Sequence, residues 1–168
     1  MTSKKSSGEK DLKIGDTAPD FTLVSQSGEK VTLKDLIGKK NIVLYFYPRD
    51  YTAGCTSEAC AFRDSYETFK QEGAEVIGIS SDTKESHTSF ASHYKLPFTL
   101  LSDNEGKVRE LYGVPKTLGL LPGRVTYIID KKGIIRHIFS SQFKPKKHID
   151  EALRILKDIG EEGQKKEV

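Results

Sequence analysis

Two continuous apolar runs constrain the fold of this chain more than any other feature. Residues 41–47 read NIVLYFY and residues 75–80 read EVIGIS. Runs of this kind, without polar alternation, are typical of strands that are buried on both faces of a mainly parallel sheet. The residues between the runs carry a helical pattern, so the middle of the chain is predicted to fold as strand, helix, strand.

Two helices are predicted around the second apolar run. After Cys55, apolar residues recur at helical spacing, and Gly73 stands where glycine often closes a helix. The recurring residues are Ala59, Phe62, Tyr66 and Phe69. The next helix follows residue 80, with Asp82 and Glu85 spaced as a capping box and Pro97 as its stop signal.

The rest of the chain adds two hairpins, a strand and two helices. Hairpins are expected at residues 21–33 and 124–140, a strand at 98–103 and a short helix at 104–114. Pro145 opens a last amphipathic helix, whose apolar face holds Ile149, Leu153, Leu156 and Ile159. This order predicts an α/β fold with a mixed sheet, helices on both faces and an added N-terminal hairpin.

The length of 168 residues suits one domain that folds without disulfides. We place that domain at residues 12–160, between a flexible polar N-terminal tail at 1–11 and a charged C-terminal tail at 161–168. The 27 Lys and Arg against 24 Asp and Glu leave a net charge of only +3, much of it in the termini and loops. We therefore expect no nucleic-acid partner.

No segment resembles a secretory signal or a membrane span, so no membrane association is expected. The prediction is a cytoplasmic protein, and the alternative is an organelle such as the chloroplast, after removal of a transit peptide. In a reducing compartment, two cysteines more often serve redox chemistry or metal binding than a structural bridge.

Both cysteines, Cys55 and Cys60, follow the first apolar run. Cys55 is expected just past the carboxyl end of a buried strand, in the first turn of a helix. Open α/β sheets bind ligands at this edge, and the unpaired N–H groups of a helix N-terminus stabilise a thiolate. Cys55 is thus positioned to be a nucleophile.

Three other interpretations of the cysteines fit the sequence less well. An inert buried Cys55 fits poorly with its small polar neighbours, Thr52, Gly54, Thr56 and Ser57. A zinc site lacks ligand spacing, because the histidines are scattered and each is expected to be a surface or packing residue: His87, His93, His137 and His148. Thioredoxin-type exchange would need Cys-x-x-Cys, which is two residues shorter than this spacing.

Three separated segments resemble the peroxiredoxins, thiol peroxidases with a thioredoxin-like fold. Pro48, Thr52 and Cys55 in PRDYTAGC match the Pro-x-x-x-Thr-x-x-Cys motif of that family. Cys60 within ACAFRD is similar to the peroxiredoxin Q (bacterioferritin comigratory protein) branch, and LPGRVTYIID to the segment that supplies an active-site arginine, here Arg124. The resemblance extends from about residue 12 to residue 159.

This resemblance implies a peroxidase that reduces hydrogen peroxide and alkyl hydroperoxides and needs no cofactor. Cys55 would become a sulfenic acid, Cys60 would resolve it as an intramolecular disulfide, and thioredoxin or a similar dithiol would reduce that bond. The Thr52 hydroxyl, the N–H groups of Gly54 and Cys55, and the Arg124 guanidinium would hold the peroxide. Pro48 would shield the pocket. Thr52 could also be a helix N-cap.

Two residues depart from the family pattern, Ala53 where proline is usual and Glu58 where glutamine is frequent. A carboxylate at Glu58 would disfavour a nearby thiolate unless Arg63 or Arg124 offsets it. A redox sensor or binding module would need the same Cys55, so the sequence leaves that alternative open. A resolving thiol within the same chain favours a monomer.

The spacing of the cysteines also makes a geometric prediction. Residues five apart in an α-helix have Cα atoms roughly 8.6 Å apart, whereas a disulfide needs about 4.4–6.8 Å. Cys55 and Cys60 are therefore expected to be unbonded while their helix is intact, and oxidation is expected to unwind its first one or two turns.

Overall fold

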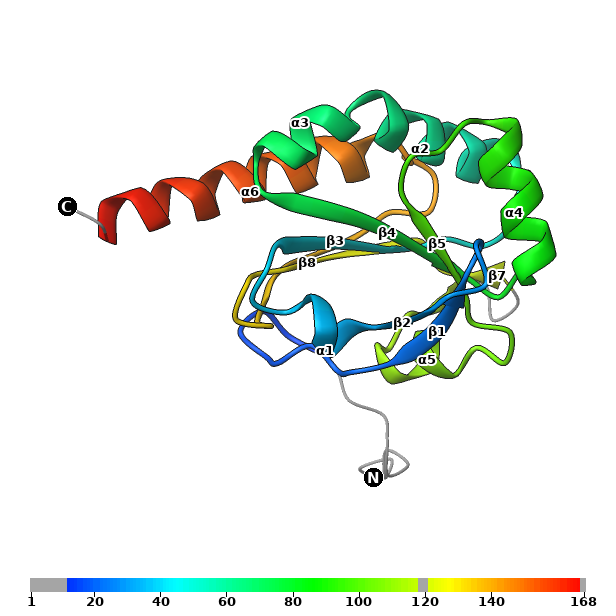
Figure 1. Cartoon of the computed structure of the whole chain (residues 1–168), viewed down its shortest axis with the longest axis horizontal. Helices are drawn as coiled ribbons and strands as arrows, with labels where there is room; N and C mark the ends of the chain where they lie inside the picture. Colours follow the sequence, from blue (N-terminus) through cyan, green and yellow to red (C-terminus); the bar gives the residue numbers. More distant parts are fainter. Residues whose placement is uncertain (1–11, 118–120, 167–168) are drawn as a thin grey trace.

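The computed structural model describes residues 12–117 and 121–166, and the predicted N-terminal tail at 1–11 lies outside them. A seven-stranded mixed sheet forms the centre of the molecule (Figure 1), in the order β2-β1-β5-β4-β3-β8-β9. Its strands are β1 (Thr22–Ser25), β2 (Lys30–Thr32), β3 (Asn41–Phe46), β4 (Ala74–Ser80), β5 (Thr99–Ser102), β8 (Val125–Ile129) and β9 (Ile135–Ser140).

Parallel and antiparallel pairs divide the sheet as the sequence predicts. β3, β4 and β5 run parallel, because helical crossovers connect them. The hairpins β1–β2 and β8–β9 join antiparallel on the two sides, at β5 and β3 respectively. The mixed sheet and the added N-terminal hairpin are therefore confirmed. A separate small ladder pairs β6 (Lys116–Thr117) with β7 (Leu121–Pro122).

Helices cover both faces of the sheet (Figure 1). One face carries α2, α3, α4 and α6, and the other carries α1 and α5. Side chains alternate along β3 accordingly: Val43 and Tyr45 pack under α2, and Leu44 faces the opposite layer. The helices are α1 (Leu33–Leu36), α2 (Ala53–Asp64), α3 (Tyr66–Gln71), α4 (Lys84–His93), α5 (Lys107–Leu111) and α6 (Lys147–Lys166).

Three local predictions differ from the structure. The helix expected from Cys55 to Gly73 is divided, because Ser65 leaves helical geometry at φ −102° and ψ 5° between α2 and α3. Asp82 does not cap α4; Thr83 does, accepting a hydrogen bond from the N–H of Ser86 at 3.1 Å.

The third difference concerns the C-terminus. Residues 161–166, expected to be a charged tail, continue α6, and Glu162 in this extension pairs with Arg136 of β9. Residues 161–166 contain no apolar side chain, and the ion pair with Arg136 links this segment to the sheet. None of the described helices combines the length and the apolar composition that a membrane span needs.

Candidate active site

The motif residues lie where the central strand β3 ends. A loop of residues 47–52 connects β3 to α2, and it contains the buried Pro48 and the exposed Thr52. Cys55 is the third residue of α2, as the sequence predicts, and its side chain is only 1% exposed. The helix N-terminus and the carboxyl end of the strand therefore meet at this thiol.

Strand pairing brings Arg124 to Cys55 from far along the chain. β8 runs antiparallel to β3 with Val125 opposite Phe46, so Arg124, one residue before β8, lies beside the end of β3. Its side chain is 4% exposed, and Nη2 donates to Sγ of Cys55 at 3.4 Å. A buried cation therefore contacts the sulfur at the N-terminus of α2.

Gly54 leaves the room that this contact needs. A Cβ atom added to Gly54 would lie 2.9 Å from Nη2 of Arg124. Such a contact is shorter than van der Waals distance, so any side chain here would displace the guanidinium. Gly54 therefore permits the close approach of Arg124 to Cys55. This steric role is additional to the backbone N–H group that the sequence analysis assigned to Gly54.

Arg124 is held in turn by Glu58, one turn after Cys55. Nη1 donates to Oε1 of Glu58 at 2.7 Å, and Nε donates to the carbonyl of Gln142 at 3.3 Å. The Glu58 side chain is fully buried, and its Oε2 has no hydrogen-bond partner among the described residues. Burial raises the pKa of Glu58 to about 8, against the lowering effect of Arg124. Arg124, and not Arg63, is therefore the cation that acts on this carboxyl group, although the effect of burial outweighs it.

His148 of α6 completes the buried layer behind Glu58. Its Nδ1 lies 3.7 Å from Oε2 of Glu58 and accepts a hydrogen bond from the Thr126 hydroxyl at 2.7 Å. Its Nε2 donates to the carbonyl of Ser141 at 2.9 Å. Burial lowers the pKa of His148 to about 4 despite that bond, and the charge of Arg124 adds to the lowering. The imidazole is therefore neutral at physiological pH, and it packs as the sequence analysis expected.

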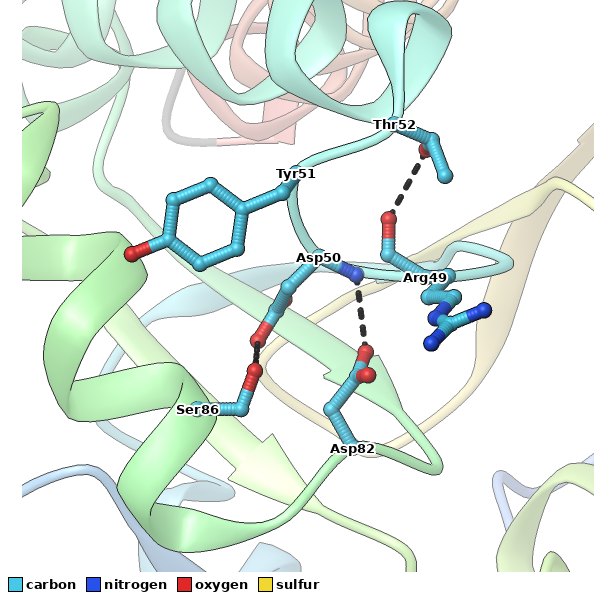
Figure 2. Close-up of a pocket in the computed structure, with 6 residues that line it drawn as sticks. All are labelled: Arg49, Asp50, Tyr51, Thr52, Asp82 and Ser86. Atoms are coloured by element: carbon cyan, nitrogen blue, oxygen red, sulfur yellow. Dashed lines mark hydrogen bonds between the residues drawn. The ribbon is translucent and has the colours of Figure 1, made fainter.

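Thr52 occupies the N-cap position of α2 without a side-chain capping bond. Its hydroxyl instead donates to the carbonyl of Arg49 at 2.9 Å, as Figure 2 shows. Because that bond uses the proton, Thr52 presents the lone pairs of Oγ1 to a ligand. Thr52 is therefore the N-cap residue of α2, as the sequence allowed, but its side chain makes no capping hydrogen bond.

Cys60 is partly buried on α2, and both cysteines are free thiols within one unbroken helix. This arrangement agrees with the geometric argument that an intact helix keeps them apart. Three residues after Cys60, the Arg63 guanidinium donates to the carbonyl of Tyr94, at the end of α4, at 2.7 Å.

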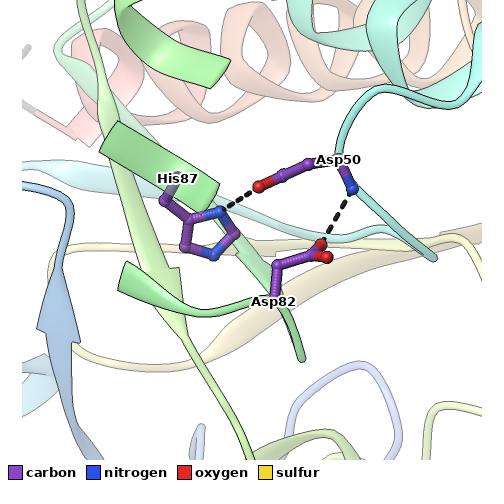
Figure 3. Close-up of side chains that lie close together, drawn as sticks. All are labelled: Asp50, Asp82 and His87. Atoms are coloured by element: carbon purple, nitrogen blue, oxygen red, sulfur yellow. Dashed lines mark hydrogen bonds and ion pairs between the residues drawn. The ribbon is translucent and has the colours of Figure 1, made fainter. Parts of the chain in front are cut away.

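Sequence reasoning missed a polar cluster beneath the same loop. A cavity of about 360 Å³ is lined by Arg49, Asp50, Tyr51, Thr52, Asp82 and Ser86 (Figure 2). Below it, potential ligand atoms of Asp50, Asp82 and His87 lie within 4.8 Å of one another (Figure 3). Both ring nitrogens of His87 are already hydrogen-bonded, so this cluster is satisfied without a metal ion. The one available signal was the position of Asp50 inside the Pro48–Cys55 motif.

Comparisons with known proteins agree with this geometry. The model of the AhpC/TSA family matches residues 14–138. Chloroplastic peroxiredoxin Q of Sedum lineare is 57% identical over 146 residues, which are 86% of this chain and 78% of that protein. Chloroplastic peroxiredoxin Q of Triticum aestivum is 56% identical over 146 residues, which are 86% of this chain and 67% of that protein.

Solved structures show the same architecture. Peroxidoxin BcpB from Mycobacterium tuberculosis superimposes with a TM-score of 0.82 at 38% identity, over 88% of this chain and 98% of that one. PrxQ from Xylella fastidiosa gives a TM-score of 0.82 at 29% identity, over 90% and 99% of the two chains. The fold is thus thioredoxin-like, and the chain belongs to the AhpC/TSA family, in the peroxiredoxin Q branch of thiol-dependent peroxidases.

Proposed function

We propose that Cys55 is the thiol of this enzyme that attacks the peroxide. The contact between Nη2 of Arg124 and Sγ of Cys55, at 3.4 Å, carries this assignment. A buried guanidinium beside a thiol at the first turn of a helix is the environment in which cysteines become reactive. Cys60 has no such neighbour among the interactions described above, so we assign it the resolving role.

The remaining site residues would act on the peroxide. More thiolate alone gives at most about a thirtyfold gain, so positioning and charge stabilisation must supply the larger part of the rate. We assign Thr52 as acceptor for the peroxide O–H. The N–H groups of Gly54 and Cys55, unpaired at the helix start, and Arg124 would stabilise the departing oxygen. The buried Pro48 would exclude water.

The chemistry balances with two thiols and an external dithiol. The Cys55 thiolate attacks one peroxide oxygen, the O–O bond breaks, and the leaving oxygen takes the electron pair and a proton as water or an alcohol. The thiolate of Cys60 then attacks the Cys55 sulfenic acid, hydroxide leaves as water after protonation, and a disulfide forms. A reduced dithiol protein of the thioredoxin type returns both sulfurs to thiols and is itself oxidised.

Hydrogen peroxide and alkyl hydroperoxides are the substrates that we propose, and a monomer is the proposed functional unit. The monomer follows from the presence of both thiols in one helix, since no second chain is needed to supply a resolving sulfur. The relatives from Sedum and Triticum are named chloroplastic. We therefore propose the chloroplast for this protein, in place of the cytoplasm, and imaging of a fluorescent fusion of the whole encoded protein would test it.

Multiple-turnover peroxide consumption with thioredoxin and thioredoxin reductase tests the enzyme assignment. Wild type should turn over many times, Cys55→Ser should consume no peroxide, and Cys60→Ser should form a sulfenic acid that dimedone traps but should not recycle through a disulfide. A redox sensor would instead react once and stop. Equal loss of the first oxidation step in both variants would contradict the roles given to the two cysteines.

A further inference from the structure

A buried carboxylate, that of Asp50, connects the loop that carries Thr52 to α4. Asp50 is 4% exposed, and its two oxygens take part in three hydrogen bonds. The Tyr47 hydroxyl donates to Oδ1 at 2.6 Å. The Ser86 hydroxyl donates to Oδ2 at 2.9 Å, and His87 approaches the same oxygen through Nδ1 at 2.7 Å. Figures 2 and 3 show Asp50 reaching from the loop to α4.

The hydrogen bonds determine where the protons of this pair lie. His87 is fully buried, and its Nε2 must donate to the Leu101 carbonyl at 3.0 Å, because a carbonyl can only accept. The 2.7 Å contact between Nδ1 and Oδ2 of Asp50 also needs a proton. One proton is therefore shared between His87 and Asp50, and together the two side chains carry no net charge. Such a pair can stay buried without a further counter-ion.

The backbone of the loop is clamped at the same point. The N–H of Asp50 donates to Oδ2 of Asp82 at 2.8 Å, and that oxygen also receives the hydroxyl of Ser80, the last residue of β4, at 2.6 Å. The next residue, Tyr51, has a left-handed backbone with φ 65°, and its ring stands edge-on to Phe90 of α4 at 5.1 Å. Thr52 follows at once, so these contacts set both its direction and the start of α2.

We propose that Asp50 is a positioning residue for peroxide reduction: bound by Tyr47, Ser86 and His87, it holds Thr52 at the distance from Cys55 that the peroxide requires. This proposal rests on the function proposed above. It assigns a role to the polar cluster of Asp50, Asp82 and His87, which does not contact the thiol. Misplacement of a substrate-binding group by about 1 Å can lower a rate about a hundredfold, so a loose loop would slow the reaction although every reacting group remained.

Two reaction rates of Cys55 distinguish a positioning role of Asp50 from a purely structural role. In a Cys60→Ser background, in which Cys55 is the one thiol, sulfenic acid formation by hydrogen peroxide depends on Thr52. Alkylation by iodoacetamide depends on the thiolate and its access, and not on Thr52. We expect Asp50→Ala to slow the peroxide reaction tenfold to a hundredfold and to leave the alkylation rate within about threefold of the background protein.

A conservative variant distinguishes hydrogen bonding from charge. In Asp50→Asn, the side-chain oxygen can still accept from Tyr47, and the amide can donate to Nδ1 of a neutral His87, so we expect a peroxide rate within about threefold of the background. The matched control is His137→Ala. His137 also faces a carboxylate, Glu151 at 3.0 Å, but between β9 and α6, and its loss should leave both rates unchanged.

Several outcomes would overturn the proposal. They are an unchanged peroxide rate in Asp50→Ala, an equal fall of the peroxide and alkylation rates, and an Asn variant as slow as the Ala variant. If Asp50→Ala does not fold, Tyr47→Phe removes one donor to Asp50 and keeps the ring, and the same selective slowing of the peroxide reaction, by several-fold, is expected. If the unmodified Cys60→Ser protein forms no sulfenic acid, the proposed function fails, and not the role of Asp50.

Discussion

At the scale of single residues, the site depends on how closely Arg124 can approach the helix start. Gly54→Ala would place a methyl group 2.9 Å from Nη2 of Arg124, in a region that the buried guanidinium cannot easily leave. We expect Gly54→Ala to lower kcat/KM for hydrogen peroxide at least tenfold, because Arg124 would move away from Cys55. Steady-state kinetics with thioredoxin measure this.

A second helical glycine supplies the control. At Gly160, in α6, an added Cβ would meet no atom within 4 Å. Gly160→Ala should therefore leave the kinetics unchanged and stabilise the fold slightly, since alanine favours helix more than glycine does. A Gly54→Ala enzyme as active as the Gly160→Ala enzyme would show that Arg124 tolerates displacement.

Glu58 makes stability depend on pH in a defined window. Burial raises the pKa of Glu58 to about 8, so the native protein retains a proton that the unfolded chain loses above about pH 4.5. The resulting stability is fully present below pH 4.5 and is lost as the pH rises through about 8. His148, with its pKa lowered to about 4, has the opposite effect, but it acts only below about pH 6.5.

The window from pH 6.5 to pH 9 lies above the range of His148, and a Cys55→Ser, Cys60→Ser background keeps both cysteines out of the comparison. We expect the free energy of unfolding of this double-serine background to fall by about 2 kcal/mol across the window. Glu58→Gln should remove most of that slope while keeping an oxygen for Arg124. Urea unfolding at a series of pH values measures it, with the 81% exposed Glu67→Gln as control. Parallel pH profiles for the double-serine background with and without Glu58→Gln would mean that another group causes the slope.

At the scale of elements, periodicity predicted most helices and strands but not how they end. The strands β3 and β4 and the amphipathic face of α6 follow from runs and spacings in the sequence. The division at Ser65 and the cap at Thr83 do not, because each depends on a local backbone geometry that several residues can adopt. The extension of α6 beyond residue 160 depends on tertiary contacts such as the pair of Glu162 with Arg136.

The division at Ser65 bears on how α2 can open. Cys55 and Cys60 cannot bond in the intact helix, and α3 begins after Ser65 with its own buried anchor, Phe69. Oxidation should therefore unwind the start of α2 and leave α3 in place. We expect amide exchange at residues 53–62 to become faster in the oxidised protein, while residues 66–71 keep their protection.

Hydrogen exchange with mass spectrometry compares the two states. The Cys60→Ser protein, treated with the same peroxide, serves as control because it cannot form the intramolecular bond. Unchanged protection of residues 53–62 after complete disulfide formation would contradict the unwinding. A loss of protection that extends through residues 66–71 would show that Ser65 does not bound the opening.

At the scale of the whole molecule, the site is assembled from segments that only the sheet topology brings together. Cys55 and Glu58 come from α2, Arg124 from the start of β8, and His148 from α6. Sequence motifs could predict Cys55 and Arg124 as site residues, because the residues around them in the sequence are distinctive. Contacts of Glu58 with His148, and of Asp50 with His87, carry no signal in the sequence, because they depend on the packing of elements far apart in the chain.

The same assembly makes disulfide formation costly for the fold as a whole. Closing a loop of about six residues restricts the unfolded chain by roughly 2 kcal/mol. Unwinding the start of α2 withdraws Cys55 and Glu58 from Arg124, and a buried cation that loses its partner costs about 3–5 kcal/mol. The loss exceeds the gain, so the disulfide should destabilise the protein.

We therefore expect the oxidised protein to be less stable than the reduced protein by about 1–3 kcal/mol, with a Tm lower by roughly 5 °C. Most disulfides have the opposite effect. Thermal unfolding of the reduced protein and of the peroxide-oxidised protein measures the difference. Arg124→Met has no buried cation that could lose its partner. In this variant, the stability difference between the reduced and oxidised proteins should become smaller or change sign, because only the restriction of the unfolded chain and the lost helix packing then contribute. A higher Tm for the oxidised wild type would show that Arg124 finds new partners once α2 opens.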